Sequence, residues 1–329
     1  MVVRFGIVGF GWVARDYMLP ALRKHPSAEL VAVVSIREED FNGLPPEIGT
    51  YTTVQAMLGA GPLDAVYVAS PNHLHAEHVA ACAAAGVDIL CEKPLAHTYA
   101  AAAELVRTVR AADSYFATAF DQRHHPAHRL MQSWVASGRL GTITQARLDY
   151  ACWLPAGWSA NNWRIDRKRA GGGAIIDLAP HGLDLLELLV GQPIEQLQLY
   201  QQRVVQDYEV DDGGVLIAKF GGGALGVHSV GYNRPETLPR RRLELIGTRG
   251  MLLAENTMGQ DPGGRLTFLA ADPGAAPQEV SFDQTTSPFY LQLDAFLRDR
   301  RGGVNLVRTL DDDIRLAKLL DDALAANPL

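Results

Sequence analysis

The sequence predicts an α/β protein that begins with a doubly wound parallel sheet and continues with an α+β domain built on antiparallel strands. Two patterns carry this prediction. Up to about residue 120, short apolar runs alternate with helical patterns, which is the βαβ rhythm of a parallel sheet. Between residues 196 and 282, strand-like runs follow one another between glycine-rich turns, which is typical of antiparallel hairpins.

In the first part, several expected strands are apolar at nearly every position. Such strands are covered by helices on both faces of the sheet, because neither face is left to water. The expected strands span residues 4–10, 29–36, 64–70, 88–93 and 115–120, with helical segments such as 12–24 and 75–85 between them.

In the second part, the motifs DDGG, FGGG, GTRG and DPGG mark turns between strands. Helical patterns return at residues 289–301 and 310–326. At 329 residues the chain is too long for one ordinary core and suits two domains. We therefore predict a nucleotide-binding domain over residues 1–120 and a second domain over residues 121–329.

Composition excludes several classes of protein. A net charge of −7 without a basic block gives nucleic acid little to bind, and the apolar runs are too short to span a membrane. The N-terminal residues lack the pattern of a signal peptide, which predicts a cytoplasmic protein. The three cysteines, Cys82, Cys91 and Cys152, have no CxxC spacing, so we expect them to be reduced and packed.

The first strand is followed by a phosphate-binding pattern. Residues Gly9-Phe10-Gly11-Trp12-Val13-Ala14 fit G-x-G-x-x-[GA] and lie between an apolar strand and a helix. The first glycine allows a tight turn, the second lets a pyrophosphate approach the backbone, and the small Ala14 lets helix and strand pack closely. We predict that residues 9–13 bind a dinucleotide.

The end of the second strand bears on which dinucleotide is bound. Where an NAD-preferring site places a carboxylate on the ribose 2′-hydroxyl, this chain has Ser35 and then Arg37. Serine can bond a 2′-phosphate and arginine can pair with it, which favours NADP(H). In the alternative, Glu38, Glu39 or Asp40 reaches the ribose, Arg37 is solvated, and NAD(H) is bound.

The third and fourth strands end in further candidate cofactor residues. The segment Ser70-Pro71-Asn72 can turn the chain across the cofactor. Glu92 and Lys93 lie at the carboxyl end of the fourth strand, the edge where doubly wound sheets bind ligands. Pro94 disfavours helical dihedrals at Lys93, so the side chain extends from the strand end, where it can polarise a substrate hydroxyl or carbonyl. The alternative is an ordinary solvated lysine.

Two histidine-rich segments, SPNHLHAEH and RHHPAHR, could suggest a metal site. Neither contains HExxH or lies near a set of cysteine ligands. We therefore predict no metal.

The segment GGGAIIDLAPHGLD, residues 171–184, places Asp177, His181 and Asp184 at i, i+4 and i+7 on one side of a helix. The surrounding residues are almost all apolar, which predicts a buried helix. Buried polar groups are costly unless they are paired, so this stripe either is paired or lines a wet cleft. It forms a reaction site or, alternatively, a self-contained Asp-His-Asp network.

Together these motifs resemble the Gfo/Idh/MocA family of oxidoreductases over nearly the whole chain. The resemblance rests on the glycine loop, the glycine triplet with Asp177 and His181, and the segments SPNHLHAEH, CEKPLAHT, QRHHPA, GRLGTI, NWRID and FYLQLDAFL. It implies a Rossmann domain and then a substrate-binding α/β domain with a large, mostly antiparallel sheet, whose open face mediates homodimers or homotetramers. Ala179, where many members have glycine, and Pro180 depart from the family pattern and put the local helix geometry in question.

The resemblance also implies the chemistry. The catalytic residues would be Lys93, His181 and Asp177, and hydride would pass between nicotinamide C4 and a carbinol or carbonyl carbon of a sugar, polyol or similar molecule. His181 would be the general acid/base, Lys93 would stabilise the alkoxide, and Asp177 would orient substrate or tune its neighbours. Asp184 is interpreted as structural. Further cofactor contacts are expected from His75, Gln122, Trp163 and Arg164.

Two alternatives stay open on the same fold. One is a non-enzymatic NADP-binding regulator, which would be expected to lack the lysine or the histidine. The other is an NAD-dependent glycoside hydrolase, which would show no net redox change. The aromatic residues between positions 150 and 158 are candidates for a sugar-stacking wall or, alternatively, for packed core.

Overall fold

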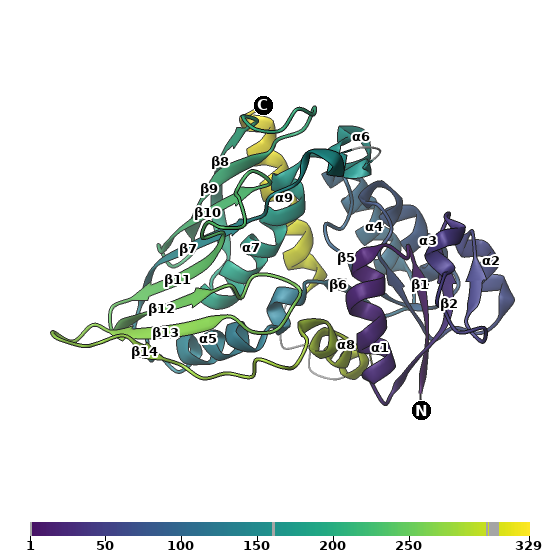
Figure 1. Cartoon of the computed structure of the whole chain (residues 1–329), viewed down its shortest axis with the longest axis horizontal. Coiled ribbons are helices and arrows are strands. Elements are labelled where there is room, and N and C mark those ends of the chain that lie inside the picture. The colour runs from purple at the N-terminus through teal and green to yellow at the C-terminus, as the bar shows by residue number, and fades with distance from the viewer. Residues whose placement is uncertain (1, 160–161, 301, 303–308) are drawn as a thin grey trace. The chain divides into compact units, whose positions relative to one another are not determined.

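The computed structural model describes residues 2–159, 162–300, 302 and 309–329, and the chain divides into two compact units (Figure 1). The first unit contains residues 1–120 and 289–314, and the second contains residues 121–288 and 315–329. The predicted second domain, 121–329, is therefore interrupted. Helix α8 belongs to the first unit because Phe289, Leu293 and Phe296 pack in one core with Phe5 and Tyr67.

The first unit is a parallel sheet in the order β3-β2-β1-β4-β5-β6, which confirms the predicted doubly wound fold. The pairs are all parallel, and separate apolar cores contain Phe5 and Tyr67 on the one hand and Val8 and Val68 on the other. The strands are β1 (Val3–Val8), β2 (Ala28–Val34), β3 (Gly49–Tyr51), β4 (Ala65–Val68), β5 (Asp88–Glu92) and β6 (Phe116–Ala119).

The helices of the first unit connect these strands. The predicted helix at 12–24 includes a π-helical stretch, η1, followed by α1, and Thr53 and Thr98 cap α2 and α4 by accepting from backbone N–H groups. The helical elements are η1 (Ala14–Met18), α1 (Leu19–Lys24), η2 (Glu38–Phe41), α2 (Val54–Ala60), η3 (Asn72–Leu74), α3 (His75–Ala84), α4 (Tyr99–Ala111) and α8 (Pro288–Asp299). Residue 301, at the end of the predicted helix 289–301, lies outside the described residues.

The second unit contains a sheet in the order β14-β13-β12-β11-β7-β10-β9-β8. Its pairs are antiparallel except for β7 with β10, which is parallel, so the predicted mostly antiparallel sheet is confirmed. The strands are β7 (Ile143–Ala151), β8 (Ile194–Gln202), β9 (Gly213–Phe220), β10 (Leu225–Gly231), β11 (Arg241–Gly247), β12 (Gly250–Glu255), β13 (Arg265–Ala270) and β14 (Gln278–Glu279).

Helix α7 (Ala174–Val190) packs against the middle of this sheet, on β7, β9 and β10, and α5 packs against α7 (Figure 1). The strands alternate accordingly: Leu216 and Ala218 of β9 are buried, while Val215 and Ile217 are exposed on the other face. The remaining helical elements are η4 (Asp121–His124), α5 (Pro126–Ala136), η5 (Ala156–Ser159), η6 (Trp163–Ile165), α6 (Arg167–Ala170) and α9 (Leu310–Ala326).

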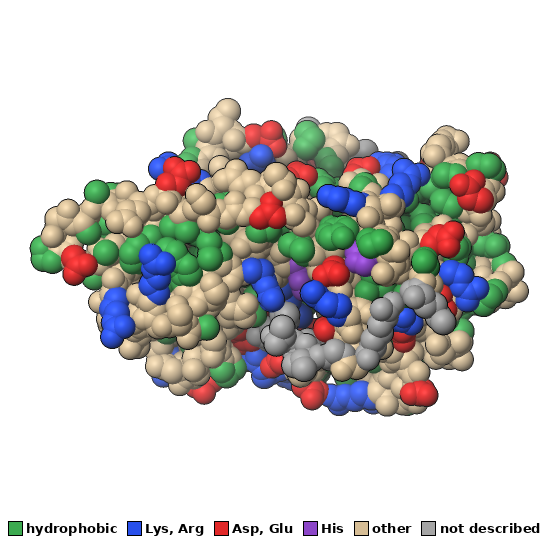
Figure 2. Space-filling view, turned by 90° about the horizontal axis from the view of Figure 1, so that it is seen from below, with side chains coloured by type: hydrophobic (Ala, Val, Ile, Leu, Met, Phe, Trp, Pro, Cys, Tyr) green, Lys and Arg blue, Asp and Glu red, His purple; other side chains and the backbone are tan. Residues whose placement is uncertain are grey.

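The surface carries both signs of charge. On the face drawn in Figure 2, Lys and Arg side chains are interspersed with Asp and Glu side chains. Among the helices in the described part of the chain, none is long and apolar enough to cross a membrane.

Candidate active site

The carboxyl ends of β1, β2, β4 and β5 share one edge of the parallel sheet, and the predicted cofactor residues follow them. Gly9 has a φ of +88°, and a Cβ there would lie 2.5 Å from the backbone nitrogen of Ser70, so only glycine fits. A Cβ on Gly11 would meet nothing within 4 Å. This open backbone fits the close approach of a pyrophosphate, as predicted for an NAD(P) site.

The side chains within the glycine loop differ in exposure. Phe10 is 2% exposed and its side chain packs in the core of the first unit, so its cofactor contact stays a prediction for the backbone. Trp12 is 42% exposed and contacts the Tyr17 ring edge-on. Val13 is partly buried against the same core.

At the end of β2, Ser35 and Arg37 share a third residue, Asp40. The Ser35 hydroxyl donates to the buried Asp40 carboxylate, and Arg37 binds both oxygens of that carboxylate, with Nη2 2.6 Å from Oδ1 and Nε 3.1 Å from Oδ2. Glu39 lies 4.0 Å from Arg37 as well. Arg37 is therefore held in place rather than simply solvated, and its side chain is still 56% exposed.

The ends of β4 and β5 are joined by His75. Its ring nitrogens lie 2.8 Å from the carbonyl oxygen of Ser70 and 2.9 Å from that of Pro94. The side chain is fully buried, and burial lowers the pKa of His75 to about 4. His75 therefore holds the loops after β4 and β5 together, and its cofactor contact stays a prediction.

The other residues of these two loops are also anchored. The Ser70 hydroxyl lies 2.9 Å from Nδ1 of His78, and Asn72 is buried at the start of η3, next to the partly exposed Pro71. Glu92 accepts a hydrogen bond from the buried hydroxyl of Tyr67. Lys93 comes directly after β5, is half-buried, and precedes Pro94 through a cis peptide bond.

In the second unit, the glycine triplet comes directly before α7 and packs closely on Asp211. A Cβ on Gly173 would lie 1.9 Å from the Asp211 carbonyl oxygen. The Asp211 carboxylate accepts from the N–H groups of Gly173 and Ile175, both at 2.8 Å, and so caps the first turn of the helix. Gly171, with a φ of +90°, ends α6.

Asp177 lies in the first turn of α7 and is half-buried. It accepts a hydrogen bond of 2.5 Å from the hydroxyl of Tyr232, which follows β10. Burial and the neighbouring Asp177 charge raise the pKa of Tyr232 well above its usual value, so this hydroxyl stays protonated and donates. The Trp158 ring contacts the Tyr232 ring, with 5.8 Å between the ring centres.

His181 lies one turn further along α7 and is 5% exposed. Its Nδ1 is 3.3 Å from Oδ1 of Asp121, which is also buried. Tyr150 of β7 contacts the imidazole edge-on at 5.8 Å between ring centres. The imidazole is therefore held between an aromatic ring and a carboxylate.

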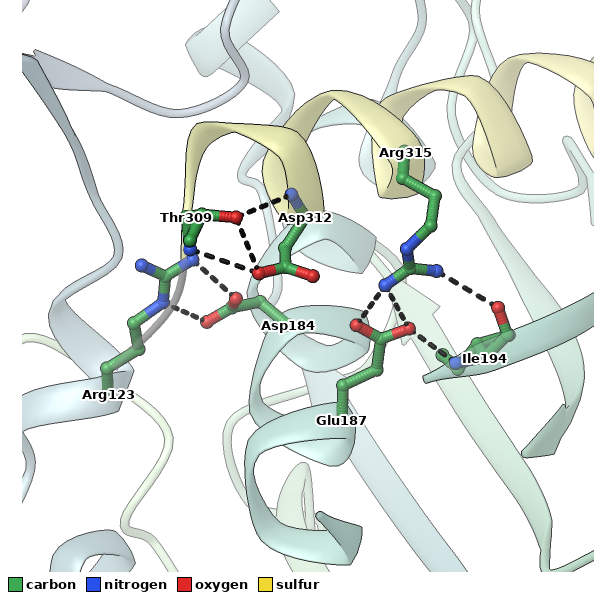
Figure 3. Close-up of polar contacts among 7 residues, drawn as sticks. All are labelled: Arg123, Asp184, Glu187, Ile194, Thr309, Asp312 and Arg315. Carbon is green, nitrogen blue, oxygen red and sulfur yellow. Dashed lines mark hydrogen bonds and ion pairs between the residues drawn. The ribbon is translucent and has the colours of Figure 1, made fainter. Parts of the chain in front are cut away.

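The inner acids of α7 are themselves buried, and each forms an ion pair with an arginine (Figure 3). Arg123 donates to both oxygens of Asp184, from Nε at 2.8 Å and from Nη2 at 2.7 Å. Arg315 of α9 donates to both oxygens of Glu187 and to the Ile194 carbonyl oxygen. Asp184 is thus structural, as interpreted from the sequence, and the stripe is not a self-contained Asp-His-Asp network.

Three other predicted cofactor residues lie in the second unit. Gln122 is fully buried, and its amide nitrogen donates to Asp121 at 2.9 Å and to the Gly259 carbonyl at 2.7 Å. Its amide oxygen is buried without a hydrogen-bond partner among the described residues, and the cofactor contact of Gln122 stays a prediction. Arg164 stacks on the Trp163 ring at 4.5 Å, and both side chains are partly exposed.

In each of the two units, some residues that contact the predicted ones have no motif that marks them: Asp40 in the first unit, and Asp121, Arg123, Tyr150, Asp211 and Tyr232 in the second. Each is separated from its partner by a turn or by a long stretch of chain. The one available signal was the acidic character of residues 38–40, which raised Asp40 as an alternative ribose contact.

In the described parts of the chain, no group of three or more His, Cys, Asp or Glu side chains is placed to hold a metal ion. All three cysteines are free, and burial raises the pKa of Cys82 and of Cys152 to about 12, which keeps both thiols protonated.

Comparison with known proteins gives a consistent picture. Residues 3–120 match the model of an oxidoreductase family with an NAD-binding Rossmann fold, and residues 128–253 match the GFO/IDH/MocA C-terminal domain. The chain is 32% identical to 1,5-anhydro-D-fructose reductase of Ensifer adhaerens over 82% of its own length and 80% of the relative's. It is 29% identical to D-xylose 1-dehydrogenase (NADP(+)) 2 of Haloferax volcanii over 93% and 95%. Its fold matches the aldose-aldose oxidoreductase of Caulobacter crescentus, complexed with glycerol, with a TM-score of 0.86, 22% identity and coverage of 99% and 98%.

Proposed function

Because the chain belongs to the Gfo/Idh/MocA family of oxidoreductases, we propose that it is an NADP(H)-dependent oxidoreductase acting on a CH–OH carbon of a sugar or polyol. One observation carries the proposal. Asp177 and His181 lie one turn apart on α7; the Tyr232 hydroxyl donates to Asp177, and the Asp121 carboxylate lies 3.3 Å from Nδ1 of His181. The names of the relatives support the substrate class, since they act on an anhydro-sugar and on an aldose.

The cofactor, when bound, supplies or accepts the hydride at nicotinamide C4; the side chains handle the proton and the charge. His181 takes the proton of the substrate hydroxyl in oxidation and returns it in reduction. Lys93, at the end of β5, stabilises negative charge that develops on the substrate oxygen. Asp177, fixed by the Tyr232 hydroxyl, accepts a hydrogen bond from a neighbouring substrate hydroxyl and so orients the sugar.

The assay is a panel of keto- and aldo-sugars with NADPH, or of sugars and polyols with NADP⁺, followed at the nicotinamide absorbance. Lys93→Ala and His181→Asn are each expected to lower kcat by about 10²–10⁴. Lys24→Ala, at an exposed lysine that ends α1, is the control and keeps wild-type turnover. Wild-type turnover in both site variants would refute the assignment. Hydrolysis of a glycosidic bond without net redox change would instead identify a glycoside hydrolase.

We propose NADP(H) as the preferred cofactor because Arg37 presents an exposed guanidinium at the end of β2. Arg37→Ala is expected to reduce the ratio of kcat/KM for NADPH to that for NADH by roughly tenfold or more, since a charge-assisted contact is removed. The control is Arg107→Ala on the exposed side of α4. An unchanged ratio would favour the alternative in which an acid contacts the ribose.

We also propose that the chain forms a homodimer or homotetramer through the open face of β8, β9 and β10. Ile217 lies opposite Val227 and Val215 lies opposite Tyr200, so their exposed side chains form a continuous apolar patch. Ile217→Lys should shift the mass in solution to that of a monomer, whereas Val204→Lys, at an exposed position outside the sheet, should not. A wild-type protein that is a monomer by light scattering would refute this proposal.

The predicted cytoplasmic location stays a prediction.

A further inference from the structure

The segment Asp121–Arg123 is docked along one turn of α7 by two contacts. Asp121 lies against His181, and Arg123 forms the bidentate pair with Asp184, three residues further on the helix. Both acids and the arginine are buried, each with 6% exposure or less. The ion pair therefore fixes the backbone that carries Asp121 at a defined height on the helix.

The Asp121 carboxylate is itself oriented. Gln122 donates from Nε2 to Oδ2 of Asp121 at 2.9 Å, and the same nitrogen donates to the Gly259 carbonyl at 2.7 Å. A flipped amide would place its oxygen against that carbonyl, so Gly259 fixes which way the amide points. The other oxygen, Oδ1, is the one that lies 3.3 Å from Nδ1 of His181.

Nδ1 of His181 is buried and makes no hydrogen bond to any residue that the structure describes. A buried N–H is costly to leave unsatisfied, and a carboxylate within ion-pair distance is the acceptor it can reach by a small ring rotation. Catalytic contacts of this kind are often long before substrate binds and tighten afterwards.

We infer that Asp121 is a positioning residue: its carboxylate accepts from Nδ1–H of His181 and so leaves Nε2 as the nitrogen that exchanges the proton with the substrate. This rests on the proposed acid/base role of His181. A neutral imidazole carries one ring proton, and the group facing Nδ1 decides which nitrogen holds it. The negative charge also stabilises the imidazolium that forms when a substrate proton is taken up.

Asp121→Asn tests the inference because asparagine has the shape of aspartate but can present a hydrogen-bond donor, instead of an acceptor, to Nδ1 of His181. Gln122 still needs an acceptor, so the single oxygen of asparagine faces Gln122 and its NH₂ group faces His181. That NH₂ group donates to Nδ1 and moves the imidazole proton to Nε2, which can then no longer accept a proton. We expect kcat to fall by about 10²–10⁴ while KM for the cofactor stays within roughly threefold.

The matched control is Thr257→Val. Thr257 contacts Nε2 of His128, whose Nδ1 bonds the Gln122 carbonyl, so this variant loosens the same segment without touching the Asp121 carboxylate. Its kcat should remain near wild type. An equal loss of kcat in Thr257→Val and Asp121→Asn would show that Asp121 is only structural and would overturn the inference, as would Asp121→Asn with kcat within tenfold of wild type, a loss below the range of general acid–base catalysis.

A spectroscopic readout needs no variant at the tested position. In protein labelled with ¹⁵N-histidine, the ring signals of His181 are assigned by their absence from His181→Asn. The wild type should carry its ring proton on Nδ1, and a proton on Nε2 would overturn the inference even if Asp121→Asn does not fold. If Lys93→Ala and His181→Asn both keep full activity, the proposed function fails. If His181→Asn loses activity and Asp121→Asn keeps it, the inference alone fails.

Discussion

The two units build their candidate sites in different ways. In the first, the residues follow consecutive strand ends, and backbone geometry dominates: Gly9 has its left-handed φ, Gly11 an open backbone, and Lys93 directly follows β5. In the second, the site consists of side chains that meet across long stretches of chain, such as Asp177 with Tyr232, 55 positions apart. A motif can specify the first kind of site, whereas the second kind exists only once the fold has formed.

The difference extends to buried titratable groups, and acid is the largest perturbation we expect. Burial lowers the pKa of His75, His125 and His228 to about 4 and that of His128 to about 3, against a usual value of 6.5. The unfolded chain therefore binds more protons below pH 6.5, so stability is full above that pH and falls as the pH drops towards 4, by on the order of several kcal/mol in total.

Three of these histidines lie in the second unit, and only His75 lies in the first. Tryptophan fluorescence reports mainly the second unit, because Trp12 is the one tryptophan of the first unit. On acidification between pH 6.5 and 4, the fluorescence transition should precede the loss of far-ultraviolet circular dichroism. Coincident transitions would show that the units unfold together, and a melting temperature that rises with acid would contradict the sign.

Buried ion pairs in the second unit should matter more than surface pairs in the first. Asp184→Ala removes the carboxylate that accepts both bonds from the buried Arg123, and we expect a loss of about 3–5 kcal/mol of unfolding free energy. Glu104→Ala removes a pair with Arg107 whose side chains are 59% and 72% exposed, and this should cost less than about 1 kcal/mol. Urea unfolding of both variants measures the difference, and equal losses would remove this distinction between the units.

The smallest effects concern one substitution made in a helix of each unit. A Cβ on Gly182 of α7 would lie 2.1 Å from Nε2 of the buried His228, so Gly182→Ala should cost about 1–3 kcal/mol through overpacking. Gly59 of α2 is exposed, and a Cβ there meets nothing within 4 Å, so Gly59→Ala should stabilise by about 0.5–1 kcal/mol. Thermal unfolding decides the two signs, and a shared sign would contradict the packing argument.

The strands and helices were predictable to different extents. The near-continuous apolar runs of β1, β2, β4, β5 and β6 indicate a sheet covered on both faces, while the three residues of β3 are too short to give a pattern. The central strand β7 is not among the predicted strands either. Its parallel pairing with β10 depends on a connection that includes α7, which no local pattern reveals.

Helix α8 shows why the domain boundary was only partly predictable. Its helical pattern is clear in the sequence, but its apolar side chains pack on Phe5 and Tyr67, more than 200 positions earlier. Burial of those rings is a property of the assembled core, so the return of the chain to the first unit follows from tertiary packing.

The sequence by itself determined the Rossmann sheet, the phosphate loop, the family, and the stripe that carries Asp177 and His181. These follow from neighbours along the chain, because strand period, helix period and the φ that glycine permits are local properties. The tertiary structure alone decided that Arg37 is held by Asp40, that the side chains of His75 and Gln122 are buried, and that Asp121 faces His181. Buried polar groups must be hydrogen-bonded, and they pair with the groups that the fold brings close to them. The positions of two residues in the sequence do not show whether the fold brings them together.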